Sequence, residues 1–371
     1  MTERNYAALD YAVMGARTLM KKFTPALLPP PGLFHYHQGV FLSGTEKTYL
    51  HTGLSDLADY IKAWVDGIVS PDGVITNYVK ERFDDLQPGI LLFRLYRETG
   101  DSRYKKAIET IYSHMRVWPK NKAGGFFHKF EHPNQMWLDG LYMAGPFLAM
   151  YGAETGNTEC FDEFYRQAVI MWQHNRRSGS DLMYHAWDES REEAWADKET
   201  GISPECWGRA FGWYIVALTT ALDYIPKDYP HRSELIEIIR RCAAVIAKYQ
   251  DSKSGLWYQV VDKGYDENNW TEISCSALFT AGLAKAAAEE YIGGEYESVI
   301  EKGYRGVINA ITVNDDETIS VPRICVGTGV GDYDFYIHRP TVENDLHGMG
   351  AFLLMCNEYE DFKPSKQVWR R

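Results

Sequence analysis

Apolar and polar positions recur along the chain with the spacing of helices rather than strands. One stretch begins with the apolar run at residues 90–96, passes a short polar turn at 98–101, and continues as a second helical pattern to residue 111. It ends in the glycine- and aromatic-rich segment 124–128. This pattern predicts a helical hairpin followed by an irregular segment.

The same order returns in three further stretches, at residues 147–185, 213–258 and 277–321, and residues 60–75 look like the tail of an earlier copy. The turns at 98–101 and 154–157 read Glu-Thr-Gly-Asp and Glu-Thr-Gly-Asn, so each places a glycine after a helix, as a C-terminal cap requires. Helical hairpins that repeat in this way are arrayed in a row or in a ring.

Five or six such hairpins would form either an open solenoid or a closed barrel of inner and outer helices. Chemically rich residues recur after the second helix of each copy, and a ring would collect these segments on one face. The sequence therefore favours an all-α closed barrel. Because no Pro- or Ser-rich linker interrupts the chain apart from the Leu-Pro-Pro-Pro stretch at 28–31, residues 1–371 are expected to form one domain.

Composition narrows the class of protein. The 371 residues are 45% hydrophobic and 24% charged, which is usual for a soluble globular chain. A net charge of -12 argues against nucleic acid and anionic membranes as partners. No apolar stretch is long enough to span a membrane, and residues 1–5 carry acid and base with no long apolar run behind them, so no secretory signal is expected.

The six cysteines are widely spaced and form no C-x-x-C pair, which excludes a zinc ribbon or a thioredoxin-like motif. Buried free thiols are expected, and they suit a reducing compartment, so the expected location is the cytoplasm. The 11 Trp, 25 Tyr and 16 Phe would stack on sugars where they face a cleft, although most are expected in the core.

Asp139 stands in a dense run of aromatic and apolar residues at 135–143. An ionised carboxylate is costly to bury there, and an apolar setting raises its pKa toward the value that a general acid needs near neutral pH. The alternative is a simple helix N-cap, because Asp is favoured at that position and an apolar run follows. The window by itself leaves both interpretations open.

Asp84 and Asp85 precede the helix start at residues 87–89, a position equivalent to that of Asp139 in the repeat. Two carboxylates at equivalent repeat positions would face each other across a cavity, and such a pair is the minimal equipment of glycoside-bond chemistry. At least one of the two neighbouring aspartates is expected to be only a helix cap.

Arg209 lies between Trp207 and Trp213. It would bind a substrate carboxylate while the indole faces hold sugar rings, and the alternative is a cation–π packing pair. Gly208 and Gly212 weaken a helix and are expected to permit close backbone approach.

Other motifs narrow the chemistry. If the segment His35-Tyr36-His37 lay on a strand, its two histidine rings would point to the same side. A metal site would need at least one further ligand and an orienting second shell, so a hydrogen-bonding or sugar-contacting role is preferred for this pair. The glycines at 327–331 do not follow the dinucleotide-binding order and suit a loop that lines a site, and Asp345 would cap the next helix. Neither a nucleophile elbow nor a P-loop is present.

Taken together, these segments resemble glycoside hydrolase family 105, the unsaturated rhamnogalacturonyl hydrolases. The resemblance rests on motifs that occur in the family's order: His128-Lys129, residues 135–140, 184–188 and 204–209, Gly212-Trp213, and the stretch 327–347. The motifs reach from about His35 to His347. The resemblance implies an (α/α)6 barrel, in agreement with the repeats.

The resemblance also implies removal of a Δ4,5-unsaturated galacturonyl residue from the non-reducing end of pectin fragments, typically linked to rhamnose. Such fragments are made outside the cell by lyases and imported, which fits a cytoplasmic enzyme. In the family mechanism a carboxylic acid protonates C4 of the vinyl ether, water adds at C5, and the resulting hemiketal rearranges with loss of the glycosidic bond.

By resemblance, Asp139 is the proton donor and then the base for water, Asp84 is the second carboxylate, and His185 orients the water or binds the sugar. Counting back from residues 87–89 favours Asp84 over Asp85. Substrate-binding roles fall on Tyr36, His128, Lys129, Trp207, Arg209, Trp213, His338 and Arg339. No metal or organic cofactor is expected, since proton transfer and positioning suffice. The partner is an unsaturated uronyl oligosaccharide, bound by a monomer or weak homo-oligomer.

Three other functions remain open at this point. An unsaturated glucuronyl hydrolase of the related family 88 would share the barrel and the chemistry, but its sulfated substrates need more basic subsites than this acidic chain offers. A sugar epimerase or isomerase on the same barrel would use a His pair and release no second sugar. A non-catalytic oligosaccharide binder would tolerate loss of Asp139.

Overall fold

The computed structural model describes residues 6–177 and 179–362. Residues 1–5, on which the expected absence of a secretory signal depends, lie outside this part of the chain. Within it, no helix is both long and apolar enough to cross a lipid bilayer. The six cysteines are buried and unpaired, as expected.

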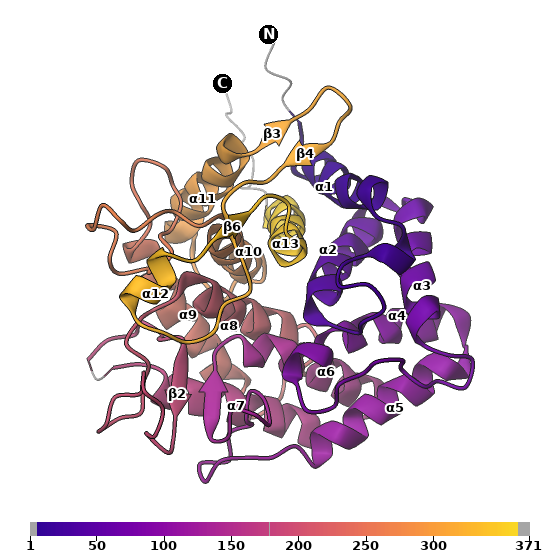
Figure 1. The fold of residues 1–371 in the computed structure, drawn as a ribbon, viewed down its shortest axis with the longest axis horizontal. Helices are drawn as coiled ribbons and strands as arrows, with labels where there is room; N and C mark the ends of the chain where they lie inside the picture. The colour runs from indigo at the N-terminus through magenta and orange to yellow at the C-terminus, as the bar shows by residue number, and fades with distance from the viewer. Residues whose placement is uncertain (1–5, 178, 363–371) are drawn as a thin grey trace.

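Helices alternate along the chain between an outer and an inner ring (Figure 1). The outer helices are α1 (Ala8–Lys22), α3 (Ser55–Ile68), α5 (Ser102–Arg116), α7 (Glu159–His174), α9 (Arg232–Lys248) and α11 (Glu297–Ala310). The inner helices are α2 (Tyr36–Thr52), α4 (Leu91–Thr99), α6 (Gly140–Thr155), α8 (Gly208–Ala221), α10 (Ile273–Ala288) and α13 (Leu346–Phe362). Helix α13 packs against both α10 and α2 and thereby closes the ring.

The two rings differ in the way their helices are buried. Inner helices such as α6, α8 and α10 bury almost every side chain, whereas outer helices such as α5 and α9 bury one apolar stripe. A helix that is apolar all round needs neighbours on every side, and an amphipathic helix needs them on one side only. The predicted all-α fold, an (α/α)6 barrel, is confirmed.

The predicted hairpins correspond to α4–α5, α6–α7, α8–α9 and α10–α11. Gly100 and Gly156 follow α4 and α6 with φ angles of 68° and 73°, in the left-handed conformation expected of these turns. The sequence patterns did not reveal α2 as a member of the ring. Its buried hydroxyl residues hide the apolar periodicity, and they are tolerated because Ser43, Thr45 and Thr48 each donate to a carbonyl one turn earlier.

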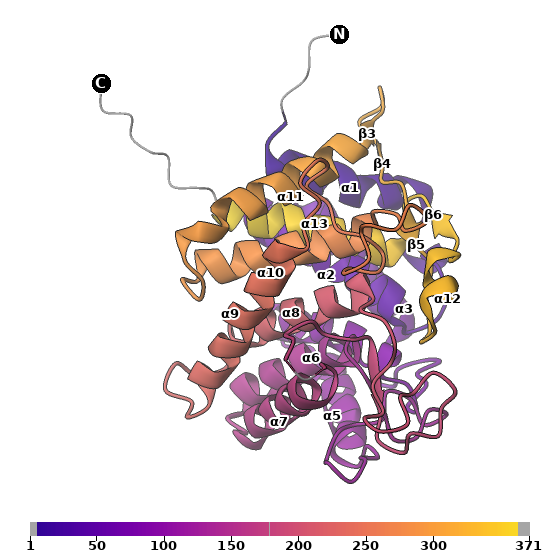
Figure 2. The same cartoon turned by 90° about the vertical axis from the view of Figure 1, so that its left-hand side faces the viewer.

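Short elements join the helices. The strands pair in antiparallel fashion as β1 (Gln135–Trp137) with β2 (Ala186–Asp188), β3 (Thr312–Val313) with β4 (Ile319–Ser320), and β5 (Ile324–Cys325) with β6 (Thr341–Val342). The 3-10 turns are η1 (Pro25–Leu27), η2 (Phe83–Asp85), η3 (Gln87–Ile90) and η4 (Gly294–Tyr296), and helix α12 (Tyr333–Ile337) lies between β5 and β6. Figure 2 shows α12, β5 and β6 together at one end of the ring.

Candidate active site

A cavity of about 410 Å³ is formed where inner helices begin and connecting loops meet. Its lining comprises His35, Tyr36, His37, Asp84, His128, Lys129, His132, Trp137, Asp139, Met143, Trp207, Arg209, Trp213, Gly327, Thr328 and Gly329. Eight of the predicted site residues are therefore brought together. A larger hollow of about 700 Å³ around Arg176, Arg177 and Trp187 contains none of them.

Asp139 is the residue that immediately precedes α6, and its side chain makes no capping hydrogen bond. The helix-cap interpretation is therefore wrong for its side chain, which lines the cavity instead. The pairing of β1 with β2 continues with the N–H of Leu138 donating to the carbonyl of His185, and this contact places Asp139 beside His185. One carboxylate oxygen of Asp139 lies 3.4 Å from His185 Nε2, and the other lies 3.9 Å from His128 Nε2.

The pKa of Asp139 is lowered to about 2. Burial by itself would raise it, but the charges of His128 and His185 and hydrogen bonding to His185 outweigh burial. The expectation that an apolar setting raises this pKa is therefore wrong, because the sequence window does not show the two imidazoles. Burial lowers the pKa of His128 to about 4 and also lowers the pKa of His185.

His185 is held in one orientation by Tyr336, a residue that sequence analysis missed. The Tyr336 hydroxyl lies 2.6 Å from His185 Nδ1 and accepts a hydrogen bond from the backbone N–H of Gly331. The ionised Asp139 carboxylate, 3.4 Å from Nε2, can only accept, so Nε2 of His185 carries the ring proton and Nδ1 accepts from the Tyr336 hydroxyl. His185 is fully buried and does not itself line the cavity.

The neighbouring aspartates have different surroundings. Asp84 lines the cavity and lies 3.1 Å from Lys129 Nζ. Asp85 points away and accepts a hydrogen bond from the backbone N–H of Val79 at 2.9 Å, so it supports the loop rather than capping a helix. Burial raises the pKa of Asp85 to about 7. Asp84 is therefore the aspartate that the structure places in the same cavity as Asp139.

Arg209 both packs against a tryptophan ring and faces the cavity. Its guanidinium lies 4.4 Å from the ring centroid of Trp207, and it also lines the cavity. It donates to the backbone carbonyls of Cys325 and Val326 and so holds the loop that carries Gly327. The predicted close approaches at the glycines of α8 are confirmed, since a Cβ on Gly208 would lie 2.9 Å from Cys275 Sγ.

Aromatic rings form much of the cavity wall. Trp213 stacks on Tyr142 at 4.4 Å, and Trp137 stacks on His128 at 4.3 Å. Trp137 and His132 belong to the lining but were not predicted as site residues. The concentration of aromatic and imidazole rings at residues 126–137 was a usable signal for both.

The segment His35-Tyr36-His37 does not lie on a strand, so the one-sided arrangement that a strand would give its two histidines does not apply. Tyr36 begins α2, and His35 is its N-cap residue. The two histidine rings nevertheless stack at 5.1 Å, because the N-cap side chain folds over the first turn. The chain thus delivers all three rings to the cavity.

Two predicted substrate-binding residues do not line the cavity. His338 is exposed at the end of α12, with Nδ1 2.8 Å from the carbonyl oxygen of Asp334. Arg339 donates to the carbonyl of Gly327 and lies 3.2 Å from the hydroxyl of Thr328, so it supports the 327–329 loop from behind. As predicted, that loop lines the site.

This arrangement is suited to proton transfer at a bound sugar acid. A carboxylate between two imidazoles can hold a proton or release it, and a second carboxylate lies in the same cavity. Lys129 and Arg209 supply positive charge for a carboxylate ligand, and the aromatic rings supply stacking surfaces.

The chain is similar to known glycoside hydrolases in sequence and in structure. The profile of Glycosyl Hydrolase Family 88 matches residues 12–363. The unsaturated rhamnogalacturonyl hydrolase YesR of Bacillus subtilis (strain 168) is 26% identical over 298 residues, which cover 79% of this chain and 79% of YesR. A family 105 glycoside hydrolase of C. acetobutylicum ATCC 824 superposes with a TM-score of 0.89 and 34% identity, covering 95% of this chain and 99% of its own. The unsaturated glucuronyl hydrolase of Bacillus sp. GL1 shares the fold, with a TM-score of 0.71, 17% identity, and coverage of 94% and 95%.

Proposed function

The chain belongs to Glycosyl Hydrolase Family 88. From its similarity to YesR and to a family 105 glycoside hydrolase, we propose that it removes a Δ4,5-unsaturated galacturonyl residue from the non-reducing end of rhamnogalacturonan fragments. The observation that carries the proposal is the position of Asp139, in the cavity and between two buried imidazoles. The similarity to a rhamnogalacturonyl hydrolase supports galacturonyl-rhamnose as the preferred linkage.

In the proposed reaction the protonated carboxyl of Asp139 gives its proton to C4. The electron pair of the double bond between C4 and C5 forms the new C–H bond, and positive charge develops at C5 beside the ring oxygen. Water adds at C5 while its proton passes to the Asp139 carboxylate. The hemiketal then opens, and the linked sugar leaves as its free hydroxyl form.

Asp139 must acquire a proton for this role, because its low pKa leaves it ionised in the free protein near neutral pH. A bound uronate brings a second negative charge and displaces water from the cavity. Both effects favour the protonated carboxyl and would raise the pKa of Asp139 in the complex.

The other lining residues would position the sugar. Among the lining residues, one arginine, Arg209, and one lysine, Lys129, carry positive charge. Two such side chains suit the single carboxylate of a uronate better than the additional charges of a sulfated disaccharide. Asp84, held by Lys129, would accept a hydrogen bond from a sugar hydroxyl. Trp207, Trp213 and Tyr36 would form the walls, and His128 would contact polar groups of the uronate. Lyase products imported from outside the cell would meet this enzyme in the cytoplasm, where its free thiols would stay reduced.

The deciding experiment follows the ultraviolet absorbance of a Δ4,5-unsaturated galacturonyl-rhamnose disaccharide. The wild type should abolish the conjugated band and release rhamnose, whereas Asp139→Asn should be slower by at least roughly 10²–10⁴-fold, the usual contribution of one acid–base group. The matched control is Asp56→Asn, which removes an exposed carboxylate paired with Arg17 and should leave turnover unchanged.

Two of the alternative functions have their own signatures in this assay. Loss of the band without release of rhamnose would indicate an isomerase. Faster turnover of an unsaturated glucuronyl disaccharide would place the enzyme with the glucuronyl hydrolases. Near-normal turnover by Asp139→Asn would exclude Asp139 as the acid.

A further inference from the structure

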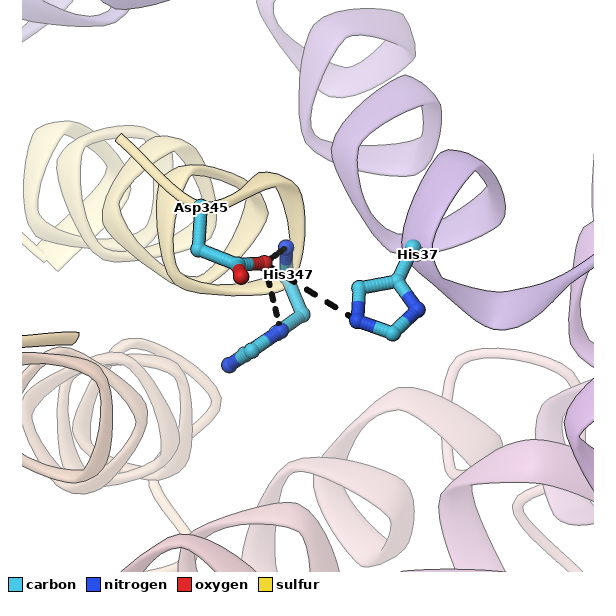
Figure 3. Close-up of side chains that lie close together, drawn as sticks. All are labelled: His37, Asp345 and His347. Carbon is cyan, nitrogen blue, oxygen red and sulfur yellow. Dashed lines mark hydrogen bonds and ion pairs between the residues drawn. The ribbon is translucent and has the colours of Figure 1, made fainter. Parts of the chain in front are cut away.

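A cluster of two histidines and one carboxylate lies beside the cavity, where the first and last inner helices meet. His37 is in the first turn of α2, Asp345 immediately precedes α13, and His347 is in its first turn. One ligand atom of each residue lies within 4.8 Å of the other two. In Figure 3 dashed lines join the Asp345 carboxylate to both rings, which come from different helices.

The hydrogen bond of His347 determines which of its ring nitrogens carries the proton. Nε2 lies 3.0 Å from the carbonyl oxygen of Cys325, and because a carbonyl only accepts, Nε2 donates. In the neutral ring Nδ1 then presents a lone pair. This nitrogen is buried, lies 2.8 Å from Asp345 Oδ1, and has no hydrogen-bond partner among the described residues. A lone pair and a carboxylate oxygen in contact repel each other, so either a second ring proton, which makes an ion pair with Asp345, or a metal cation lies between them.

The ring of His37 is oriented by the same reasoning. His35 Nδ1 accepts a hydrogen bond from the backbone N–H of His37, and His37 Nδ1 lies 3.1 Å from that acceptor nitrogen. His37 Nδ1 is therefore the protonated nitrogen. Its Nε2 carries the lone pair and lies 3.9 Å from Asp345 Oδ1. Both rings thus hold their protons on the outer nitrogens and direct lone pairs toward one carboxylate oxygen.

We propose that His37, Asp345 and His347 form a site for a divalent cation, with Zn²⁺ as the best fit. Two imidazole nitrogens and one carboxylate oxygen form a three-residue ligand set that leaves a position for water. Outer N–H groups bonded to a carbonyl or another acceptor are the usual shell that orients metal-bound histidines. Small side-chain rotations would bring the three atoms to the roughly 2.0–2.2 Å that Zn²⁺ requires.

The surroundings select against hard cations. Mg²⁺ and Ca²⁺ prefer oxygen ligands throughout, whereas imidazole suits Zn²⁺. Arg209 donates to the same carbonyl of Cys325 as His347, so it places a positive charge nearby. That charge disfavours ions held by electrostatic attraction more than ions held by coordination to nitrogen. The cation would join α2 to α13 and would sit in the cavity wall that His37 lines.

The test is a calorimetric titration of the chelator-treated full-length protein with ZnCl₂ alone, with MgCl₂ as the comparison. The wild type should bind about one Zn²⁺ per chain and should prefer it to Mg²⁺. His35→Phe removes the outer partner of His37 and should weaken binding by about 10–100-fold. Asp345→Asn and His347→Gln remove ligands and should weaken it further. The matched control is His231→Gln, a partly exposed histidine 2.9 Å from a carboxylate oxygen of Glu234, and it should bind Zn²⁺ like the wild type.

Coordination is read independently by loading Co²⁺ and recording its visible absorption, which should appear in the wild type and in His231→Gln and vanish in Asp345→Asn. If His347→Gln fails to fold, His37→Gln tests the same ligand set at a partly exposed side chain. No Zn²⁺ binding by the wild type, or equal binding by the wild type and Asp345→Asn, would overturn the proposal. Since no sugar is present, this result is independent of the proposed hydrolase activity.

Discussion

The protonation of Asp139 is set at the scale of single residues by its two imidazole neighbours. His128 and His185 approach it from different loops, and together they outweigh the effect of burial on its pKa. Tyr336 takes part indirectly, because its hydroxyl directs the proton of His185 toward the carboxylate. The free protein therefore keeps an ionised carboxylate ready to take up a proton when an anion arrives.

This view predicts proton uptake on ligand binding. A saturated galacturonyl-rhamnose disaccharide cannot be hydrated, so it can be titrated at pH 6 to 7 in two buffers of different ionisation enthalpy. The pKa of Asp139 is about 2 in the free protein, and the proposed mechanism requires a higher value in the complex, so binding should take up a fraction of a proton. Because binding takes up a proton, the affinity for the disaccharide should fall as the pH rises between the two pKa values.

The control for this measurement is Asp139→Asn, which should bind the disaccharide with no uptake assignable to residue 139. Equal uptake by the variant and the wild type would show that the proton goes elsewhere, for example to His185.

At the scale of elements, the contact between α8 and α10 depends on missing side chains. A Cβ at Gly212 would lie 2.7 Å from the Cβ of Leu278, so the two inner helices could not keep their separation. The same helix carries Arg209 and Trp213 into the cavity. Close packing of α8 on α10 therefore supports the site directly.

Gly212→Ala should accordingly destabilise the fold by roughly 1–3 kcal/mol through overpacking. Gly67→Ala is the matched helical control, since nothing lies within 4 Å of the added methyl group. It should stabilise the fold by roughly 0.5–1 kcal/mol by removing glycine from a helix. Chemical denaturation of both variants measures the difference, and a shift in the same direction for both would refute the packing argument.

At the scale of the whole molecule, charge opposes the approach of the proposed substrate. The net charge is -12, while the charged lining residues Asp84, Asp139, Lys129 and Arg209 balance one another. A uronate therefore meets net repulsion at a distance and attraction only inside the cavity.

Salt should then accelerate capture of the substrate. Raising the ionic strength from about 0.01 M to 0.15 M shortens the screening length from about 30 Å to 8 Å, so kcat/KM should rise, by no more than about tenfold. The turnover number kcat should change little, because it reports on the bound state. A decrease in kcat/KM with salt would mean that local cations dominate the approach.

Much of this arrangement could be predicted from the chain alone. Four helical hairpins, their glycine turns and the location of Asp84, Asp139, Lys129 and Arg209 at the ends of repeats follow from local periodicity and spacing. Helix α2 was missed because its buried hydroxyl residues, each of which donates to a backbone carbonyl one turn earlier, interrupt the apolar period.

The sequence by itself determined the repeat, and thus the ring, because amphipathic spacing dictates which face of each helix must be buried. Tertiary structure alone decided the chemistry of individual groups. The low pKa of Asp139 depends on His128 and His185, and the candidate cation site joins His37 to residues near the other end of the chain. Electrostatic interactions act through space over a few ångströms, so they depend on distances that sequence separation does not record.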